Sequence, residues 1–222
     1  MQKQFISFPK SGRSWIRYAL IQMRVGDDIL FHHDGLEYND RNRPPLDLDF
    51  AARLARYRQI GSVVYLARDP RDVMVSLFHQ VTGRFRDFFD FKGDISEFIR
   101  DPYFGAHNLQ IFRAQWDELC QQGLALKINY EDCHLDFRAV LKVVIAYFGL
   151  RVDDQIFENA CQAATFENMK KIELDGNFVE PWLRLRNGSP KVRHGVVGGY
   201  HDALSQSDVE YLNVVFRLNP AG

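Results

Sequence analysis

Residues 4–24 read QFISFPKSGRSWIRYALIQMR, and this stretch decides the fold that the sequence predicts. The apolar run Gln4–Phe8 is typical of a short β-strand, and Pro9 ends it. Ser14–Arg24 follows with apolar residues at helical spacing: Trp15, Ala19 and Met23. The stretch therefore predicts a strand, a small turn that contains Gly12, and a helix.

Strands and helices alternate in the same way along the rest of the chain. Runs rich in β-branched and aromatic residues predict strands at Ile29–His33, Ser62–Ala67 and Ala125–Tyr130. Helical patterns cover Phe50–Tyr57, Pro70–Val81, Leu135–Phe148 and a last segment that ends at about Leu218. Such alternation predicts parallel pairing and a three-layer α/β/α fold with a central parallel sheet, in a single domain over residues 1–222.

Capping residues set the expected starts of two helices. Asp69 precedes Pro70, which suits the first helical position, and both Asp69 and Asp72 are expected to cap that helix. Ser207 and Glu210 have the spacing of a capping box at the head of the last helix.

The composition excludes several classes of protein. With 46% hydrophobic and 26% charged residues, the 222-residue chain is neither disordered nor collagen-like. A net charge of −1 gives no overall field toward nucleic acid or an anionic membrane, so neither is expected as a partner. Two stretches nevertheless contain basic and no acidic residues: 1–26 and 184–201. Each is either solvated surface or part of an anion site.

Targeting signals and paired cysteines are absent from the sequence. The apolar segments are too short for a secretion signal or a membrane span, which needs about 20 residues. The three cysteines are widely spaced and form no C-x-x-C pair: Cys120, Cys133 and Cys161. They predict neither a disulfide framework nor a zinc site. We expect reduced thiols and a cytoplasmic location.

Two junctions between a strand and a helix have unusual chemistry. At Phe8–Trp15, a Gly-containing turn opens a helix, and Lys10 and Arg13 add positive charge to the backbone N–H groups there. The lysine precedes the glycine, so this is not the Walker pattern. At the second junction, Arg68 ends a strand and Ser76 lies two turns into the next helix. Each junction is either an ordinary turn or a phosphate site.

Five ordered segments resemble the sulfotransferases that use 3′-phosphoadenosine 5′-phosphosulfate (PAPS). The chain is shorter than the animal cytosolic members and looks more like compact bacterial ones. The resemblance implies a P-loop-like nucleotide-binding fold. In order, the segments are FPKSGRSW (8–15), RDPRDVMVS (68–76), NYED (129–132), TFENMK (165–170) and VRHGVVGGY (192–200).

The same resemblance implies roles for individual residues. Lys10 would contact the sulfate and the bridging oxygen, and with His33 and Ser76 it forms the catalytic candidates. The 5′-phosphate would be held by Ser11, Gly12, Arg13 and Ser14. Trp15 would stack on adenine, unless it is a core residue of its helix, and the donor site would also include Tyr130 and Phe166. The 3′-phosphate would be bound by Arg68, Ser76, Arg193, His194 and Gly195.

Three positions depart from the family pattern. Arg13 replaces a common threonine, which keeps an anion-binding role but changes its geometry. His194 stands where lysine or arginine is usual, so affinity for the 3′-phosphate would be weaker or pH-dependent. Tyr200 replaces tryptophan, which is a tolerable aromatic exchange.

Transfer to a hydroxyl requires a base. The sequence FHHDG (31–35) is similar to the family's T-H-D-G, which makes His33 the candidate and leaves Asp34 as an alternative. Adjacent residues on a strand point to opposite faces, so only one of His32 and His33 can face the site. His79 is expected to serve packing, and no histidine spacing indicates a metal site.

The resemblance implies transfer of a sulfuryl group from PAPS to an alcohol, phenol or sugar hydroxyl on a small molecule. The products would be a sulfate ester and adenosine 3′,5′-bisphosphate (PAP). Two alternatives are a catalytically silent PAP-binding protein and a nucleotide-dependent phosphotransferase. Thr82–Gly93 carries four phenylalanines, which would form an apolar acceptor wall, part of the core or a dimer contact. The sequence leaves the acceptor and the oligomeric state open.

Overall fold

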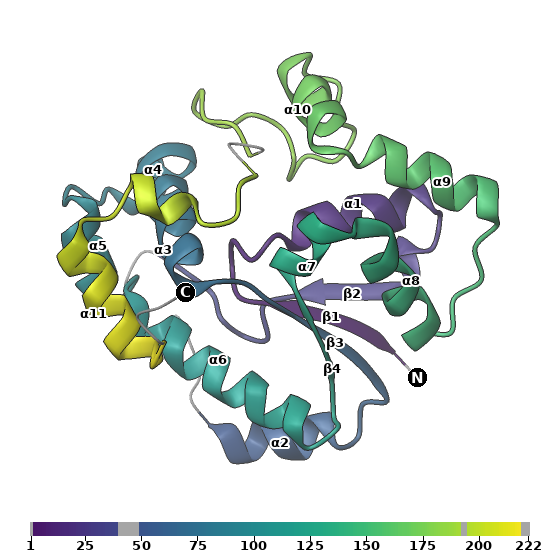
Figure 1. Cartoon of the computed structure of the whole chain (residues 1–222), viewed down its shortest axis with the longest axis horizontal. Helices are drawn as coiled ribbons and strands as arrows, with labels where there is room; N and C mark the ends of the chain where they lie inside the picture. Colours follow the sequence, from purple (N-terminus) through teal and green to yellow (C-terminus); the bar gives the residue numbers. More distant parts are fainter. Residues whose placement is uncertain (1, 40–48, 192–194, 219–222) are drawn as a thin grey trace.

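Four parallel strands form the centre of the molecule (Figure 1). The structure is a computed structural model that describes residues 2–39, 49–191 and 195–218. The sheet has the strand order β2-β1-β3-β4, with Phe5 opposite both Phe31 and Val64. Each predicted strand is confirmed to within one residue at both ends: β1 (Lys3–Ser7), β2 (Ile29–His32), β3 (Ser62–Ala67) and β4 (Leu126–Asn129).

Helices cover both faces of the sheet and confirm the predicted three-layer fold (Figure 1). One face packs against α1 (Arg13–Gln22), α7 (Tyr130–Leu135), α8 (Phe137–Tyr147), α9 (Asp154–Ala163) and α10 (Phe166–Leu174). The other packs against α2 (Phe50–Tyr57), α3 (Pro70–His79), α5 (Ile95–Arg100), α6 (Ala106–Gln121) and α11 (Gln206–Phe216). Short elements connect these layers: η1 (Gly26–Asp28), η2 (Gln80–Arg84), α4 (Arg86–Phe89) and η3 (Gly199–Asp202).

The central strand β3 shows why two cores form. Successive side chains of a strand point to opposite faces, so Tyr65 joins one apolar cluster and Leu66 the other. Both side chains are almost completely buried. Tyr65 stacks on Trp116 of α6, with ring centroids 5.4 Å apart. A strand that is buried on both faces requires the continuous apolar run that its sequence contains.

Two details of the helix prediction are wrong. Leu135–Phe148 is not one helix, because Asp136 interrupts it and accepts a hydrogen bond from the Ala139 N–H to start α8. The last helix begins two residues before the predicted capping box. Its N-cap is Ser205, whose hydroxyl oxygen accepts from the Asp208 N–H at 3.2 Å. The helices α4, α5, α6, α7, α9 and α10 were not predicted.

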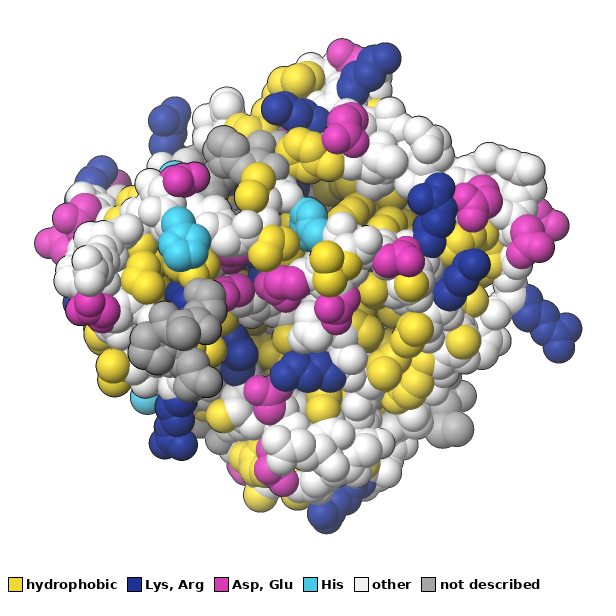
Figure 2. Space-filling view, viewed as in Figure 1, with side chains coloured by type: hydrophobic (Ala, Val, Ile, Leu, Met, Phe, Trp, Pro, Cys, Tyr) yellow, Lys and Arg dark blue, Asp and Glu magenta, His cyan; other side chains and the backbone are white. Residues whose placement is uncertain are grey.

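The surface and the thiols agree with the composition. All three cysteines are free thiols. Lysines and arginines alternate with acidic side chains over the face shown in Figure 2, and neither sign dominates it. No helix in the described part of the chain is long and apolar enough to cross a membrane. The cytoplasmic location and the single domain stay predictions from the sequence.

Truncation of one buried side chain of β3 should destabilise the fold. Leu66→Ala deletes a fully buried side chain between β3 and the helices on its face, so we expect the free energy of unfolding to fall by about 2–5 kcal/mol. Urea unfolding measures this loss. The control is Leu135→Ala, since Leu135 is 85% exposed and its loss should change stability by less than about 0.5 kcal/mol. Equal effects would contradict the assigned core.

Candidate active site

A cavity of about 770 Å³ lies at the carboxyl end of the sheet. All four strand ends contribute to its lining, which is where parallel α/β folds bind ligands. Of the predicted site residues, the cavity brings together Lys10, Gly12, Arg13, Ser14, Trp15, His33, Arg68, Ser76, Tyr130, Phe166 and Gly195. Ser11 is buried and is not part of the lining, while Arg193 and His194 lie outside the described residues.

The first loop has a backbone conformation that brings it close to the last strand. Lys10 and Gly12 both have positive φ, 72° and 97°. A Cβ atom on Gly12 would collide with the ring of Tyr130, so only glycine fits there. Gly195 is restricted in the same way by Phe166. These close approaches place backbone and two aromatic rings side by side in the cavity wall.

Trp15 is fixed by two contacts. Its ring stacks on Phe137 of α8, with centroids 4.3 Å apart and an interplanar angle of 6°. Its Nε1–H donates to the Ala164 carbonyl at 2.6 Å. Trp15 is only partly buried and also lines the cavity, so its packing contact and a role toward a ligand are compatible.

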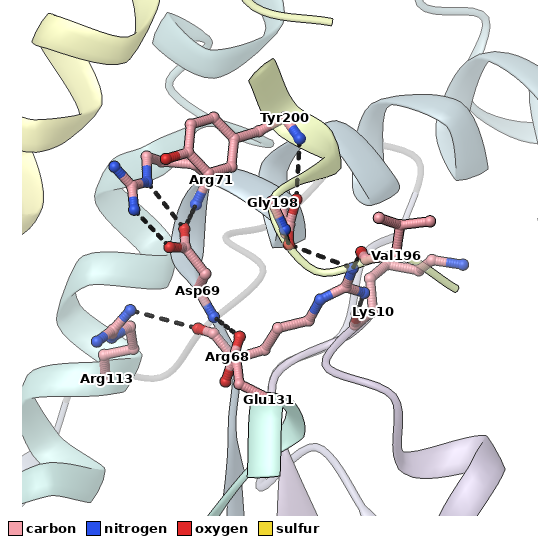
Figure 3. Close-up of polar contacts among 10 residues, drawn as sticks. Lys10, Arg68, Asp69, Arg71, Arg113, Glu131, Val196, Gly198 and Tyr200 are labelled. Carbon is pink, nitrogen blue, oxygen red and sulfur yellow. Dashed lines mark hydrogen bonds and ion pairs between the residues drawn. The ribbon is translucent and has the colours of Figure 1, made fainter. Parts of the chain in front are cut away.

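Arg68 links the first loop to the C-terminal segment (Figure 3). Its guanidinium donates to the carbonyls of Lys10 at 3.1 Å and Val196 at 3.5 Å. It also lies 4.2 Å from the centre of the Tyr130 ring. Its Nε is buried and has no hydrogen-bond partner. An anion in the cavity could accept from this group after a small movement of the side chain.

Asp72 has a role that the sequence did not reveal. Its carboxylate accepts from the backbone N–H groups of Gly198 at 2.9 Å and Tyr200 at 3.0 Å, and it lies 3.7 Å from Arg68. The prediction that Asp72 caps α3 is therefore wrong. The prediction for Asp69 is confirmed, because its carboxylate accepts from the Arg71 N–H at 2.8 Å.

Glu131 is a second carboxylate that holds the site together. It accepts from the Asp69 N–H at 2.7 Å and so joins the start of α7 to the start of α3 (Figure 3). Both Asp72 and Glu131 lie in segments that resemble the family, 68–76 and 129–132, but the resemblance implied no role for either side chain.

His33 enters the cavity with a defined tautomer. A carbonyl only accepts and a guanidinium only donates, so Nδ1–H donates to the Ser7 carbonyl at 2.6 Å and Nε2 accepts from Arg13 at 2.8 Å. Burial and the adjacent Arg13 lower the pKa of His33 to about 3. Burial and Arg17 also lower the pKa of Arg13, to about 10. His32 points elsewhere and contacts Gln4, as the alternation predicts.

Asp34 does not face the cavity, so the alternative base is wrong. Its carboxylate is buried and accepts from Arg53 Nε at 2.5 Å and from the Tyr57 hydroxyl at 2.6 Å. This network fixes the turn that follows His33. The predicted packing role of His79 is also wrong, because His79 is exposed and lines the cavity.

Two of the four phenylalanines in residues 82–93, Phe89 and Phe91, pack against the core, whereas Phe88 is 51% exposed. Phe89 and Phe91 pack against Phe104, with ring centroids 5.2 and 6.0 Å apart. Phe85 lies beneath Arg186, and Phe88 packs against Phe89. None of the four lines the cavity, so of the three alternatives for this segment the apolar acceptor wall is wrong, and a core role is confirmed for Phe89 and Phe91.

Lys191 lines the cavity and was not predicted as a site residue. Burial, Arg84 and Arg13 lower its pKa to about 8. The sequence feature that could have indicated Lys191 as a site residue is the second basic stretch without acidic residues, 184–201. Within the described residues, no group of three His, Cys, Asp or Glu side chains could hold a metal ion.

The Asp72 contacts predict how firmly the C-terminal segment is held. Asp72→Asn leaves one acceptor oxygen for two N–H groups, so we expect the amides of Gly198 and Tyr200 to exchange hydrogen at least about tenfold faster. Hydrogen–deuterium exchange of the peptide that contains them measures this. Asp175→Asn, at an exposed site after α10, should have no effect. Unchanged exchange in Asp72→Asn would contradict the assigned role.

The depressed pKa of His33 predicts a loss of stability in acid. The unfolded chain takes up a proton at His33 below about pH 6.5, whereas the folded protein does so only near pH 3, so stability falls as the pH drops between these values. Between pH 6.5 and 5.0, His33→Gln should lose about 1–2 kcal/mol less than the wild type in urea unfolding. The exposed His107 provides the control, His107→Gln. A decline in His33→Gln as steep as that of the wild type would refute the low pKa.

Comparisons with known proteins identify the family. Residues 58–221 match the sulfotransferase domain family. An amine sulfotransferase of Oryctolagus cuniculus is 24% identical over 237 residues, which cover 96% of this chain and 78% of the relative. Sulfotransferase 2A1 of Rattus norvegicus is 22% identical over 219 residues, covering 94% and 72%.

Solved structures have the same fold. The mouse sulfotransferase SULT7A1 complexed with PAP superposes with a TM-score of 0.69 at 19% identity, over 97% of this chain and 82% of that one. Retinol dehydratase in complex with androsterone and PAP gives a TM-score of 0.65 at 16% identity, over 97% and 80%. The predicted P-loop-like fold is thereby confirmed. With the matched domain, the chain belongs to the sulfotransferase family.

Proposed function

We propose that this protein transfers a sulfuryl group from PAPS to a hydroxyl group of a small-molecule acceptor. The products are a sulfate ester and PAP. The observation that carries the proposal is the cavity at the four strand ends, where Arg13 and Arg68 each have a buried N–H group without a hydrogen-bond partner. Buried donors of this kind are stabilised by an anion. Membership of the sulfotransferase family and the PAP-bound neighbours support the same assignment.

The described residues fit the parts of PAPS. The turn at residues 11–14 and the N-terminus of α1 would hold the 5′-phosphate, because the backbone N–H groups and Arg13 converge there. Arg68, Ser76 and Gly195 would hold the 3′-phosphate, together with Arg193 and His194. The adenine would lie among the three aromatic side chains of the lining: Trp15, Tyr130 and Phe166.

Lys10 and His33 would serve the transfer itself. PAPS supplies a sulfur atom that the acceptor oxygen attacks while the bond from sulfur to the 5′-phosphate oxygen breaks. Lys10 would stabilise the charge that develops on that leaving oxygen. His33 would take the acceptor proton on Nε2, since Nδ1 already carries a proton that it donates to Ser7.

Arg13 controls whether His33 can act. In the structure the Arg13 guanidinium donates a hydrogen bond to the lone pair of His33 Nε2, which is then not available to a substrate proton. A 5′-phosphate is a stronger acceptor, so Arg13 would turn toward it and free the imidazole. Removal of this cation would also raise the pKa of His33 and make it a better base.

The contact between Arg13 and His33 also favours a second candidate function. If Arg13 remained on His33 with nucleotide bound, the site would hold PAP without an available base. The protein would then be a silent PAP-binding protein.

Nucleotide binding tests the proposal without knowledge of the acceptor. PAP should raise the melting temperature in a thermal-shift titration, because it binds only the folded state, and adenosine 5′-monophosphate should shift it far less. Lys10→Ala should retain the PAP shift, yet its single-turnover release of PAP from PAPS in the presence of a panel of hydroxyl acceptors should be about 10²–10³-fold slower.

Three outcomes would contradict the proposed function or the role of Lys10. An equal shift with ATP and magnesium would favour a phosphotransferase. A PAP shift with no desulfation of PAPS by the wild type would favour the silent binder. Wild-type rates in Lys10→Ala would remove that lysine from the mechanism.

A further inference from the structure

A second, smaller cavity of about 150 Å³ adjoins the first. The two cavities share five lining residues: Lys10, Ser76, His79, Gln80 and Lys191. Lys10 is the residue proposed to contact the transferred group, so the smaller cavity lies next to the reaction centre. Its remaining lining comes from η2 and from residues 189–190.

A π-helical turn shapes this cavity. The element η2 continues α3 for one wide turn, in which the Phe85 N–H donates to the Gln80 carbonyl at 2.9 Å. Such turns are rare and occur often at functional sites. The turn places four of its five residues on the cavity wall: Gln80, Thr82, Gly83 and Arg84.

Positive charge surrounds the cavity. Lys10, Arg84 and Lys191 line it, together with His79, and no described lining residue is acidic. The Arg84 side chain is almost fully buried and is held by the Ser189 and Arg184 carbonyls, both at 3.0 Å. Arg84 therefore stays beside Lys191 in the absence of any ligand.

The carboxylate of Glu173 lies near these cations. Glu173 is 3.9 Å from Arg84 and accepts a hydrogen bond from the backbone N–H of Lys191. Despite Glu173, the pKa of Lys191 is lowered to about 8 by burial and by Arg84 and Arg13. The cluster thus has an excess of positive charge, which a bound anion would relieve.

The residues that line only the small cavity are assigned to neither phosphate of the nucleotide: Thr82, Gly83, Arg84, Ser189 and Pro190. The 3′-phosphate is assigned to Arg68, which precedes α3, and to Ser76, which lines both cavities, whereas η2 follows α3. The ten residues of the helix separate the two ends by about 15 Å. The 5′-phosphate is assigned to the first turn of α1. An anion in the small cavity would therefore come from the other substrate.

We infer that the small cavity binds an anionic group of the acceptor, a carboxylate, phosphate or sulfate, so that the acceptor is a small anionic hydroxyl compound. The inference rests on the proposed function. A volume of about 150 Å³ suits one such group, since a water molecule takes about 30 Å³ in the liquid. The core position of Phe89 and Phe91 leaves no aromatic wall from that segment for an apolar acceptor.

Inorganic phosphate is the probe for the cavity. Isothermal titration calorimetry at constant ionic strength should show one phosphate bound to the protein already saturated with PAPS. Lys191→Met should weaken this binding at least tenfold, and Lys191→Arg should restore most of it. Lys142→Met, at an exposed position on α8, is the matched control and should bind phosphate as the wild type does.

Two results would overturn the subsite. If PAPS displaces phosphate, Lys191 belongs to the donor site. If phosphate binds neither the free protein nor the PAPS-saturated protein, no anion subsite exists. Failure of PAPS to bind in its own titration would instead remove the proposed function, and that readout is separate from the phosphate titration.

Matched pairs of hydroxyl compounds then test whether the subsite serves the acceptor. Glycerol 3-phosphate and 3-hydroxybenzoate should bind the PAP-saturated protein at least tenfold more tightly than glycerol and 3-hydroxybenzyl alcohol. Lys191→Met should abolish this preference and leave PAP affinity unchanged. Equal or tighter binding of the neutral compounds to the wild type would overturn the assignment of the acceptor.

Discussion

Arg68 and Asp72, one helical turn apart at the start of α3, are the pair on which the site depends. Arg68 donates to the carbonyls of Lys10 and Val196, and Asp72 accepts from the backbone of Gly198 and Tyr200. Hydrogen bonds to charged groups contribute about 1.5–3 kcal/mol each. One ion pair thus joins the first loop, the start of α3 and the C-terminal segment, all of which line the cavity.

The electrostatics of the cavity follow from this arrangement. Carboxylates also lie near the cavity. Asp72 and Glu131 accept hydrogen bonds from backbone N–H groups, Glu173 lies 3.9 Å from Arg84, and Asp202 lines the cavity. Burial and mutual repulsion lower the pKa of Arg13, His33 and Lys191 together. A protein with a net charge of only −1 in this way concentrates positive potential at one place.

Helix α3 separates the parts of the proposed reaction. Arg68 precedes its N-terminus, Ser76 lies on its second turn, and η2 extends its far end. The helix keeps Arg68 about 15 Å from the start of η2, and Ser76, between them, lines both cavities. Asp34 and Arg53 fix the turn that carries His33. Ser76 lies on α3, and Lys10 lies in the turn between β1 and α1.

The sequence by itself determined the four strands, the three-layer fold and 11 residues of the cavity lining, because strand patterns, glycine-containing turns and short motifs are local signals. Only the tertiary structure decided the partners of Asp72, Asp34 and Lys191. The sequence suggested that Asp72 is a cap because it lies in the first turn of a helix. In the structure its carboxylate oxygens accept hydrogen bonds from N–H groups 126 and 128 residues further along the chain. Which backbone donors remain unpaired depends on how distant segments pack, and short-range patterns contain no information about that packing.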